Sequence, residues 1–312
     1  MTNVRFSNVV TGAGRYAPSP SGDLHLGNLR TALLAWLFAR STDRRFLMRV
    51  EDLDRVRPGA QARQLADLAA IGLDWDGPVI RQSERLPRYQ AAIDRLTDAG
   101  LVYECYCTRR EIQQAATAPH GPMGAYPGTC RALTDAERAA HRADRRPAAL
   151  RLRASVTEFE IVDELHGRYR GQVDDLVLRR GDGTPAYNLA VVVDDAAQGI
   201  DQVVRGDDLL SSTPRQAYLA SLLELPVPQY AHVPLVLNEA GIRLAKRDGA
   251  VTLADQLALG NTPEQVAAAL ACSLGYPPLS PIELLDSFTP AHLPMEPWIL
   301  DENGLLQRNR CP

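Results

Sequence analysis

Residues 15–28 read RYAPSPSGDLHLGN, a stretch that predicts a turn from a β-strand into an α-helix. Two prolines and a glycine set a tight path after a short strand that we expect within residues 9–16. Leucines then follow at spacings of 3, 4 and 4, which is a helical period: Leu26, Leu29, Leu33 and Leu37. His25 falls on the first turn of this helix, where backbone N–H groups and the helix dipole favour anions.

The alternation of strand and helix continues beyond this turn and predicts an α/β fold. Residues 45–50 have the pattern of a second strand, and helical patterns follow at about 59–71 and 84–99. This order of elements favours a parallel sheet with right-handed crossovers.

The middle of the chain breaks the alternation. Residues 105–147 are rich in Cys, His, Pro and Gly, and segments 148–153 and 173–179 have the pattern of antiparallel strands. Apolar segments of the first type resume from Pro185. We therefore expect four parts: the first half of an α/β domain at 1–104, an inserted subdomain at 105–175, the second half at 176–240, and a loop with a helical region at 241–312.

Composition excludes several classes of protein. The 312 residues are 45% hydrophobic and 23% charged, which is ordinary for a globular protein and unlike a disordered chain or a coiled coil. A net charge of −4 excludes a generally basic nucleic-acid binder, so RNA contact requires a local patch. Residues 131–153 form one, with seven Arg against three acids, and this predicts either phosphate contact or a solvated helix face.

We expect neither a membrane span nor a disulfide framework. The sequence has no run of 18 apolar residues, and its first residues lack an apolar core of signal-peptide length. Five cysteines, an odd number, fit a reducing cytoplasmic compartment.

Lys246 is the only lysine among 34 basic residues, because all the others are arginine. A bias toward Arg codons explains the ratio but does not explain the exception. A compact ammonium group can follow a phosphate oxygen as the geometry changes, where a planar guanidinium fits less well. The position therefore predicts a functional lysine in a loop.

Five separated motifs resemble those of class I aminoacyl-tRNA synthetases in the glutamyl and glutaminyl branch. They occur in the family's order: RYAPSPSGDLHLG at 15–27 for its HIGH signature, VEDLD at 50–54, YNLA at 187–190, VRGDD at 204–208, and RLAKR at 243–247 for its mobile KMSKS loop. Arg243 replaces the family's first Lys in that loop and Ala245 replaces its Ser, while Lys246 is kept. The resemblance implies a Rossmann-like catalytic domain with an inserted zinc-containing subdomain and a short helical C-terminal region.

The resemblance also implies the roles of individual residues. The glutamate pocket is lined by Arg15, Ala17, Ser19, Glu51, Tyr187 and Arg205. ATP is bound by His25, Gly27, Asn28 and Lys246, of which His25 and Lys246 are catalytic. Gly27 has no side chain, so a flat ring fits against its backbone. The chemistry agrees, because an arginine fork binds a carboxylate bidentately, whereas glutamine would leave that buried charge uncompensated.

Three cysteines predict a metal site in the insertion. Cys105, Cys107 and Cys130 lie within 26 residues, and zinc takes four ligands in a tetrahedron. The residues alone leave the fourth ligand open between Tyr126, His120 and His141, and they leave open that the cysteines are only small buried side chains. The resemblance implies Tyr126 and one structural Zn²⁺.

Only 66 residues follow Lys246, so we expect no full anticodon-binding region. This architecture resembles truncated paralogues of glutamyl-tRNA synthetase, which activate L-glutamate with ATP and Mg²⁺ without requiring tRNA and transfer it to queuosine at the wobble position of tRNA(Asp). The expected partners of a monomer are thus L-glutamate, ATP and that anticodon stem-loop. Two other interpretations stay open: a compact synthetase that charges a tRNA 3′ end, and a catalytically silent RNA- or protein-binding module.

Overall fold

The computed structural model describes residues 12–108, 110–112, 126–144, 147–242, 244 and 251–300. Its first elements are β1 Ala13–Tyr16, α1 Leu26–Arg40, β2 Arg45–Val50, α2 Ala60–Ala70, β3 Ile80–Arg81 and α3 Leu86–Asp98. They confirm the strands and helices predicted up to residue 99. The middle elements are β4 Val102–Cys105, α5 Asp135–Ala143, β5 Ala149–Leu152, β6 Glu158–Asp163, β7 Gly167–Gln172 and β8 Val177–Arg179.

The second half returns to the alternating pattern. It contains α6 Tyr187–Gln198, β9 Gln202–Gly206, α7 Thr213–Leu222, β10 Gln229–Val233, β11 Val236–Asn238, α8 Leu253–Ala258, α9 Pro263–Ser273, α10 Pro281–Leu285 and β12 Trp298–Leu300. Short 3₁₀ helices lie at Gln82–Arg85, Asp207–Ser212 and Pro290–His292. In the part of the chain described, no helix has the length and apolarity needed to cross a bilayer.

Five parallel strands form the centre of the molecule in the order β3-β2-β1-β9-β10. β1 and β2 pair in parallel, as do β2 with β3 and β9 with β10. A bridge between Ala13 and Ile200 joins β1 to the start of β9, and the Asp201 N–H donates to the Ala13 carbonyl at 3.1 Å. The order of the strands reverses between β1 and β9, and ligands of such sheets bind at this switch point, beyond the carboxyl ends of the strands.

The two faces of this sheet carry different side chains, because successive residues of a strand point to opposite faces. One face packs on α1 through apolar residues such as Phe46, Met48 and Val204, with α9 and α10 in the same core. The other face carries Arg15 and Arg205, which contact α6 and α7. An apolar face thus supports a charged one.

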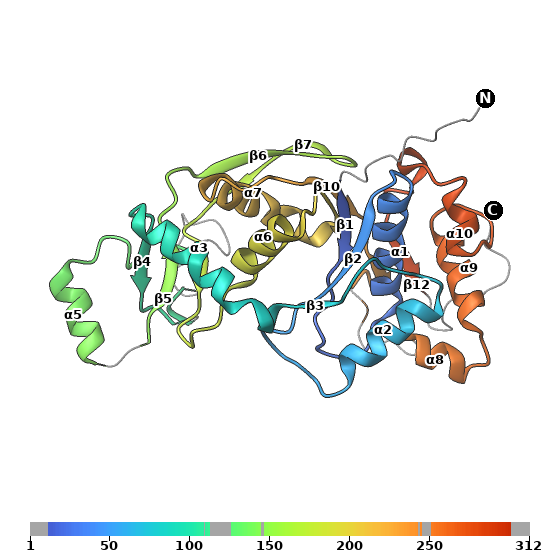
Figure 1. Cartoon of the computed structure of the whole chain (residues 1–312), viewed down its shortest axis with the longest axis horizontal. Helices are drawn as coiled ribbons and strands as arrows, with labels where there is room; N and C mark the ends of the chain where they lie inside the picture. Colours follow the sequence, from blue (N-terminus) through green and yellow to red (C-terminus); the bar gives the residue numbers. More distant parts are fainter. Residues whose placement is uncertain are drawn as a thin grey trace, which may run out of the picture.

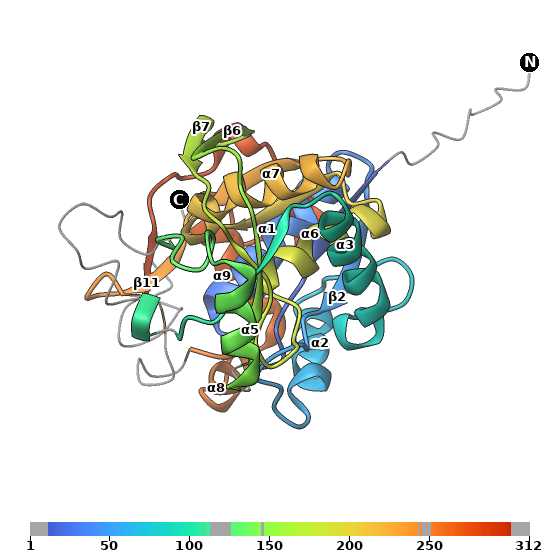
Figure 2. The ribbon, with the colours of Figure 1, turned by 90° about the vertical axis from the view of Figure 1, so that its left-hand side faces the viewer.

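A second, antiparallel sheet has the order β4-β5-β8 and confirms the antiparallel strands predicted in the middle of the chain. It lies with α5 at one end of the molecule, while α8, α9 and α10 lie at the other end (Figure 1). Figure 2 looks from the end that carries α5. The β6–β7 hairpin pairs with β10 of the central sheet, whereas β8 pairs with β5. The boundaries expected for the insertion stay a prediction.

Candidate active site

The predicted phosphate-facing turn begins α1. His25 is the N-cap: its Nδ1 accepts the N–H of Asn28 at 3.2 Å, and the Asn28 Oδ1 accepts the N–H of His25 at 3.1 Å. Because Nδ1 accepts, the ring proton of His25 lies on Nε2. A Cβ at Gly27 would lie 3.0 Å from the His25 ring and 3.2 Å from Val236. The glycine therefore serves the packing of this turn, and its contact with ATP stays a prediction.

The segment between β1 and α1 lies against the residues that follow β2. The Glu51 N–H donates to the Pro18 carbonyl at 3.0 Å, and Gln64 Nε2 donates to the Ser19 carbonyl at 3.0 Å. Ala17 is half-buried at this junction and Ser19 is exposed. The predicted pocket residues of the two segments are thereby held side by side.

Four predicted pocket residues converge at the switch point. Arg15 and Arg205 are the next-to-last residues of β1 and β9, Glu51 directly follows β2, and Tyr187 begins α6. Tyr187 is 41% exposed, yet desolvation of its hydroxyl raises its pKa, and the charges of Arg205, Glu51 and Arg15 act on the same hydroxyl. Two guanidinium groups, a carboxylate and a phenol thus share one environment, which suits an amino acid with a second carboxylate.

Arg15 is already paired with an acid. Its Nε and Nη2 donate to Asp195 at 3.3 and 3.4 Å, and Arg49 donates to the same carboxylate at 2.7 Å. Burial raises the pKa of Asp195, but Arg15 and Arg49 more than offset this and hold it below its usual range. Burial also raises the pKa of Glu51, against the opposing charges of Arg49 and Arg15. Asp195 and Arg49 were not predicted from the sequence, although two acids at the end of the apolar run VVVDD were a signal of buried ion pairs.

Arg205 has neutral partners instead. It is 6% exposed, and it donates to His232 Nε2 at 3.1 Å and to Thr213 Oγ1 at 2.8 Å. Its guanidinium carbon lies 5.6 Å from the ring centroid of Tyr230, whose pKa burial raises to about 12. Asp207 and Asp208, which follow it in sequence, do not form ion pairs with Arg205 in the described part of the chain. His232, Thr213 and Tyr230 were not predicted from the sequence.

Lys246 lies outside the described residues, as do Arg243 and Ala245, and their roles stay predictions. The segment that follows them adjoins the phosphate-facing turn: the Leu26 N–H donates to the Val251 carbonyl at 2.8 Å, and Thr252 forms a bridge with His25. The chain after the lysine loop is therefore anchored beside His25.

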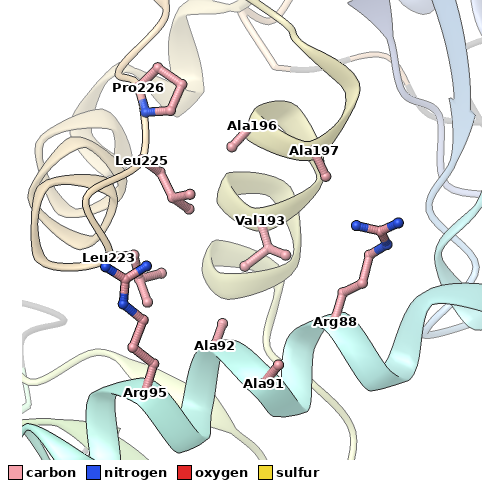
Figure 3. A pocket seen from close by; sticks show the side chains of 10 residues that line it. All are labelled: Arg88, Ala91, Ala92, Arg95, Val193, Ala196, Ala197, Leu223, Leu225 and Pro226. Atoms are coloured by element: carbon pink, nitrogen blue, oxygen red, sulfur yellow. The ribbon is translucent and has the colours of Figure 1, made fainter.

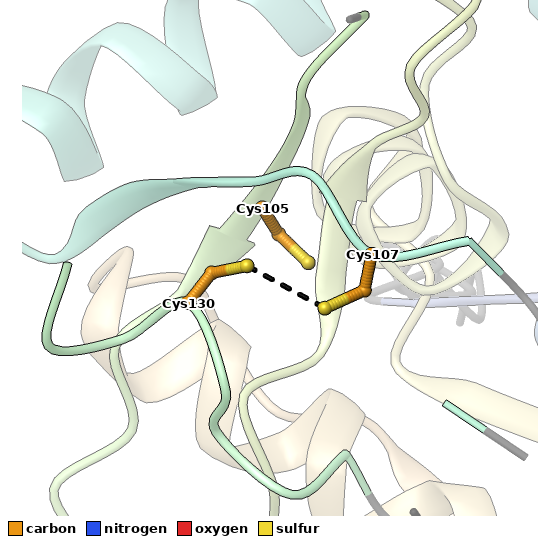
Figure 4. Close-up of side chains that lie close together, drawn as sticks. All are labelled: Cys105, Cys107 and Cys130. Carbon is orange, nitrogen blue, oxygen red and sulfur yellow. Dashed lines mark hydrogen bonds between the residues drawn. The ribbon is translucent and has the colours of Figure 1, made fainter. Parts of the chain in front are cut away.

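The three predicted metal-binding cysteines converge, although 25 positions separate the first from the last (Figure 4). The Sγ atoms of Cys105, Cys107 and Cys130 lie within 4.8 Å of one another. The Tyr126 hydroxyl lies 3.3 Å from the Cys105 Sγ and 3.6 Å from the Cys107 Sγ. Ligand atoms bonded to a tetrahedral zinc at about 2.0–2.3 Å stand roughly 3.3–3.8 Å apart, so these four donors fit the ion.

The other candidates for the fourth ligand differ in position. His141 stacks on the Tyr106 ring with the centroids 4.6 Å apart, and His120 lies outside the described residues. Burial raises the pKa of Tyr126 and raises that of Cys107 to about 12. A divalent cation is the partner that would hold such buried groups ionised.

Most described arginines of the predicted basic patch are engaged within the protein. Ion pairs join Arg142 to Glu104 at 2.7 Å, Arg138 to Asp135 at 3.4 Å, and Arg131 to Asp175. Arg145 and Arg146 lie outside the described residues. This pairing favours the interpretation as a solvated helix face over phosphate contact.

A pocket of about 390 Å³ lies away from these residues, between α3, α6 and the turn that follows α7 (Figure 3). Arg88 and Arg95 rise from α3 on either side of Ala91 and Ala92, and Val193 faces them from α6. None of the predicted site residues lines it, so it is a separate feature of the molecule.

Three comparisons with known proteins bear on the site. The family model described as tRNA synthetases class I (E and Q), catalytic domain, matches residues 9–290. The chain is 79% identical over 303 residues to a glutamyl-Q tRNA(Asp) synthetase of Nocardia farcinica, covering 97% of both chains. It is 55% identical over 282 residues to one of Cutibacterium acnes, covering 88% of this chain and 80% of the relative. A solved glutamate tRNA ligase from Elizabethkingia meningosepticum, in complex with its amino acid, superposes with a TM-score of 0.80 at 26% identity, over 93% of this chain and 67% of that one.

Proposed function

The chain belongs to the class I tRNA synthetases of the glutamate and glutamine branch and is an enzyme of the ligase type, and from this we propose its reaction. The protein activates L-glutamate with ATP and transfers it to queuosine, the wobble base of tRNA(Asp). The family match and the relatives confirm the family that the five motifs indicated. The glutamate part of the proposal is carried by the convergence of Arg15, Glu51, Tyr187 and Arg205 at the strand ends. The names of the relatives support tRNA(Asp) and its queuosine as the acceptor.

The pocket binds both the α-ammonium group and the side-chain carboxylate of glutamate. Glu51 takes the α-ammonium group, and Arg205, assisted by Tyr187, takes the side-chain carboxylate by a bidentate contact. Arg15 is held by Asp195 and lines the pocket between Glu51 and Arg205. Ala17 and Ser19 form the wall of the pocket. Glutamine is rejected, because its amide would leave the Arg205 charge unpaired in a buried site.

Activation joins glutamate to AMP, and this step needs no tRNA. An oxygen of the α-carboxylate attacks the α-phosphorus of ATP and breaks its bond to pyrophosphate. His25 Nε2–H and the Gly27 N–H stabilise the charge that develops, while Asn28 holds the His25 ring in place and Lys246 holds the departing pyrophosphate. Class I synthetases use Mg²⁺ with ATP, and the ion neutralises charge on the phosphates. A queuosine hydroxyl then attacks the glutamyl carbonyl and releases AMP.

The remaining parts of the proposal concern the whole chain. Cys105, Cys107, Tyr126 and Cys130 hold one structural Zn²⁺ in the subdomain inserted at 105–175, between catalytic halves at 1–104 and 176–240. The region 241–312 supplies the lysine loop and the C-terminal helices. The protein acts as a monomer in the cytoplasm, where tRNA and ATP are available.

Transfer of labelled glutamate tests the proposal. Labelling of tRNA(Asp) that carries queuosine, and none of the same tRNA without it, is the expected result. Equal labelling of both would contradict the acceptor, and charging of an unmodified tRNA(Glu) transcript would support the compact synthetase. Absence of glutamate-dependent pyrophosphate exchange would support the silent binding module.

A further inference from the structure

Asp163, His232 and Arg205 form a buried row across three neighbouring strands. β6, β10 and β9 lie side by side, and His232 is the register partner of Arg205. Asp163 Oδ2 lies 2.6 Å from His232 Nδ1, and Arg205 Nε donates to His232 Nε2 at 3.1 Å. The three residues are 1%, 0% and 6% exposed in that order, so solvent does not compete for these bonds.

The donors in this row fix the proton of His232. Arg205 presents only N–H donors, so His232 Nε2 must accept. The ring proton therefore lies on Nδ1 and is donated to Asp163. Burial lowers the pKa of His232, the hydrogen bond to Asp163 opposes this, and the charge of Arg205 adds to the lowering, so the ring is neutral. Asp163 is held in turn by the N–H groups of Leu165 and His166, each 3.0 Å from its Oδ1.

We propose that His232, oriented by Asp163, is a positioning residue that aims Arg205 at the side-chain carboxylate of glutamate while keeping any acid of the protein out of direct contact with the arginine. This inference rests on the proposed function. The described contacts use the Nε–H of Arg205 and one N–H of Nη2, the latter to Thr213. Within the described residues this leaves the edge formed by Nη1 and Nη2 for a bidentate carboxylate. An acid in place of His232 would hold the guanidinium equally well but would neutralise it.

Arg15 shows the opposite arrangement in the same pocket. Its partner is the carboxylate of Asp195, so the fold itself balances its charge. Selection of glutamate over glutamine then falls on Arg205, because a neutral amide is costly only beside a buried cation that lacks a counter-charge. His232 thus determines specificity through another residue.

Asp163→Asn tests the inference by switching the tautomer of His232. The amide oxygen takes the place of Oδ1, which accepts the N–H groups of Leu165 and His166 at 3.0 Å. The amide nitrogen then takes the place of Oδ2, donates to His232 Nδ1 and gives up the bond that Oδ2 accepts from the His232 backbone N–H at 3.1 Å. The ring proton then moves to Nε2, where Thr213 Oγ1 at 3.0 Å can accept it, so Nε2 no longer accepts from Arg205 Nε–H and the guanidinium loses the contact that positions it. We expect calorimetry to show glutamate affinity falling by about tenfold or more, the loss of one charge-assisted contact, with a much smaller change for glutamine.

Two further variants separate positioning from folding. His232→Gln offers a neutral oxygen near the Nε2 position and should retain most of the preference for glutamate, whereas His232→Leu should lose it. Asp175→Asn is the matched control, because Asp175 is 6% exposed against 1% for Asp163 and also accepts a backbone N–H, from Ala154 at 2.8 Å, but it contacts Tyr103 of β4 outside the pocket. It should lower the Tm as Asp163→Asn does and leave the preference unchanged.

¹⁵N NMR of the imidazole rings reads the tautomer without any ligand. The wild type should show His232 protonated at Nδ1 alone, and Asp163→Asn should show it protonated at Nε2. Wild-type protonation at Nε2, or an unchanged preference after the tautomer has switched, overturns the inference. A folded wild type that has the expected tautomer but binds no glutamate overturns the proposed function, and with it this inference.

Discussion

At the scale of single residues, substitution of Arg205 tests whether the glutamate pocket has been assigned to the correct residues. Arg205→Ala leaves the ligand carboxylate without its charged partner, which should cost on the order of 2–4 kcal/mol in kcat/KM for glutamate-dependent pyrophosphate exchange. Arg168→Ala is the control, because Arg168 is 78% exposed on the edge strand β7 and should change nothing. A loss below about tenfold for Arg205→Ala would place this arginine outside the pocket.

Lys246 supports a second prediction at this scale, which rests on its being the only lysine. Lys246→Ala should slow pyrophosphate exchange by about one to two orders of magnitude, since one charge-assisted contact is worth roughly 1.5–3 kcal/mol. Lys246→Arg should recover only part of the rate, because a planar fork cannot follow the departing pyrophosphate as a point charge does. Thermal unfolding serves as the control. Full activity of the arginine variant would show that any cation suffices.

At the scale of elements, the ion pairs of Asp195 join α6 to β1 and β2. Asp195→Asn leaves Arg15 and Arg49 buried without their shared counter-charge, which should lower the free energy of unfolding by about 3–5 kcal/mol at neutral pH. The pKa of Asp195 is lowered in the folded protein, so its contribution is present above the ordinary pKa of about 3.9 and is lost as the pH falls through the folded value. The wild type and the variant should therefore converge in stability in acid.

Denaturant unfolding from pH 3 to pH 8 measures this difference. Asp182→Asn is the control: Arg180 holds the pKa of Asp182 at about 2, but the Asp182 side chain is 52% exposed and water screens the pair, so its loss should barely change stability. An Asp195→Asn variant as stable as the wild type at pH 7 would show that the pair contributes no net stability.

The cysteine cluster is a second device at this scale, because it joins the end of β4 to the loop before α5. Purified protein should contain about one zinc per chain, as a single closed site requires. A Cys107→Ser/Cys130→Ser variant removes two of the four donors and should lose the metal together with stability. Near-stoichiometric zinc in that variant would reject this ligand set.

At the scale of the whole molecule, the acceptor defines the reaction. Labelled glutamate transferred to queuosine should be recovered, after ribonuclease digestion of tRNA(Asp), in the anticodon fragment and not in the 3′-terminal fragment. The proposed acceptor is a base of the anticodon and not the 3′-terminal ribose, so the two possible acceptor sites lie in different fragments. Label confined to the 3′ end would show a conventional synthetase.

Much of this protein could be predicted from short-range pattern. The leucine spacing after His25 predicts α1, and the apolar run at 45–50 predicts β2 with the same bounds that the structure has. Arg15, Glu51 and Arg205 could be placed at strand ends because a strand and the residue that ends it are neighbours in sequence. The five motifs are local for the same reason, and their order was enough to identify the family.

Only the tertiary structure decided what these residues touch. Arg15 lies 180 positions from Asp195, and Asp163 lies 69 positions from His232. Such pairs leave no periodicity in the chain, and each member read alone is an ordinary strand or helix residue. They form because a parallel sheet brings distant strands into register and buries their charges, and a buried charge or imidazole must find a partner there. Register and burial therefore determined that Arg15 is neutralised by an acid while Arg205 rests on a histidine.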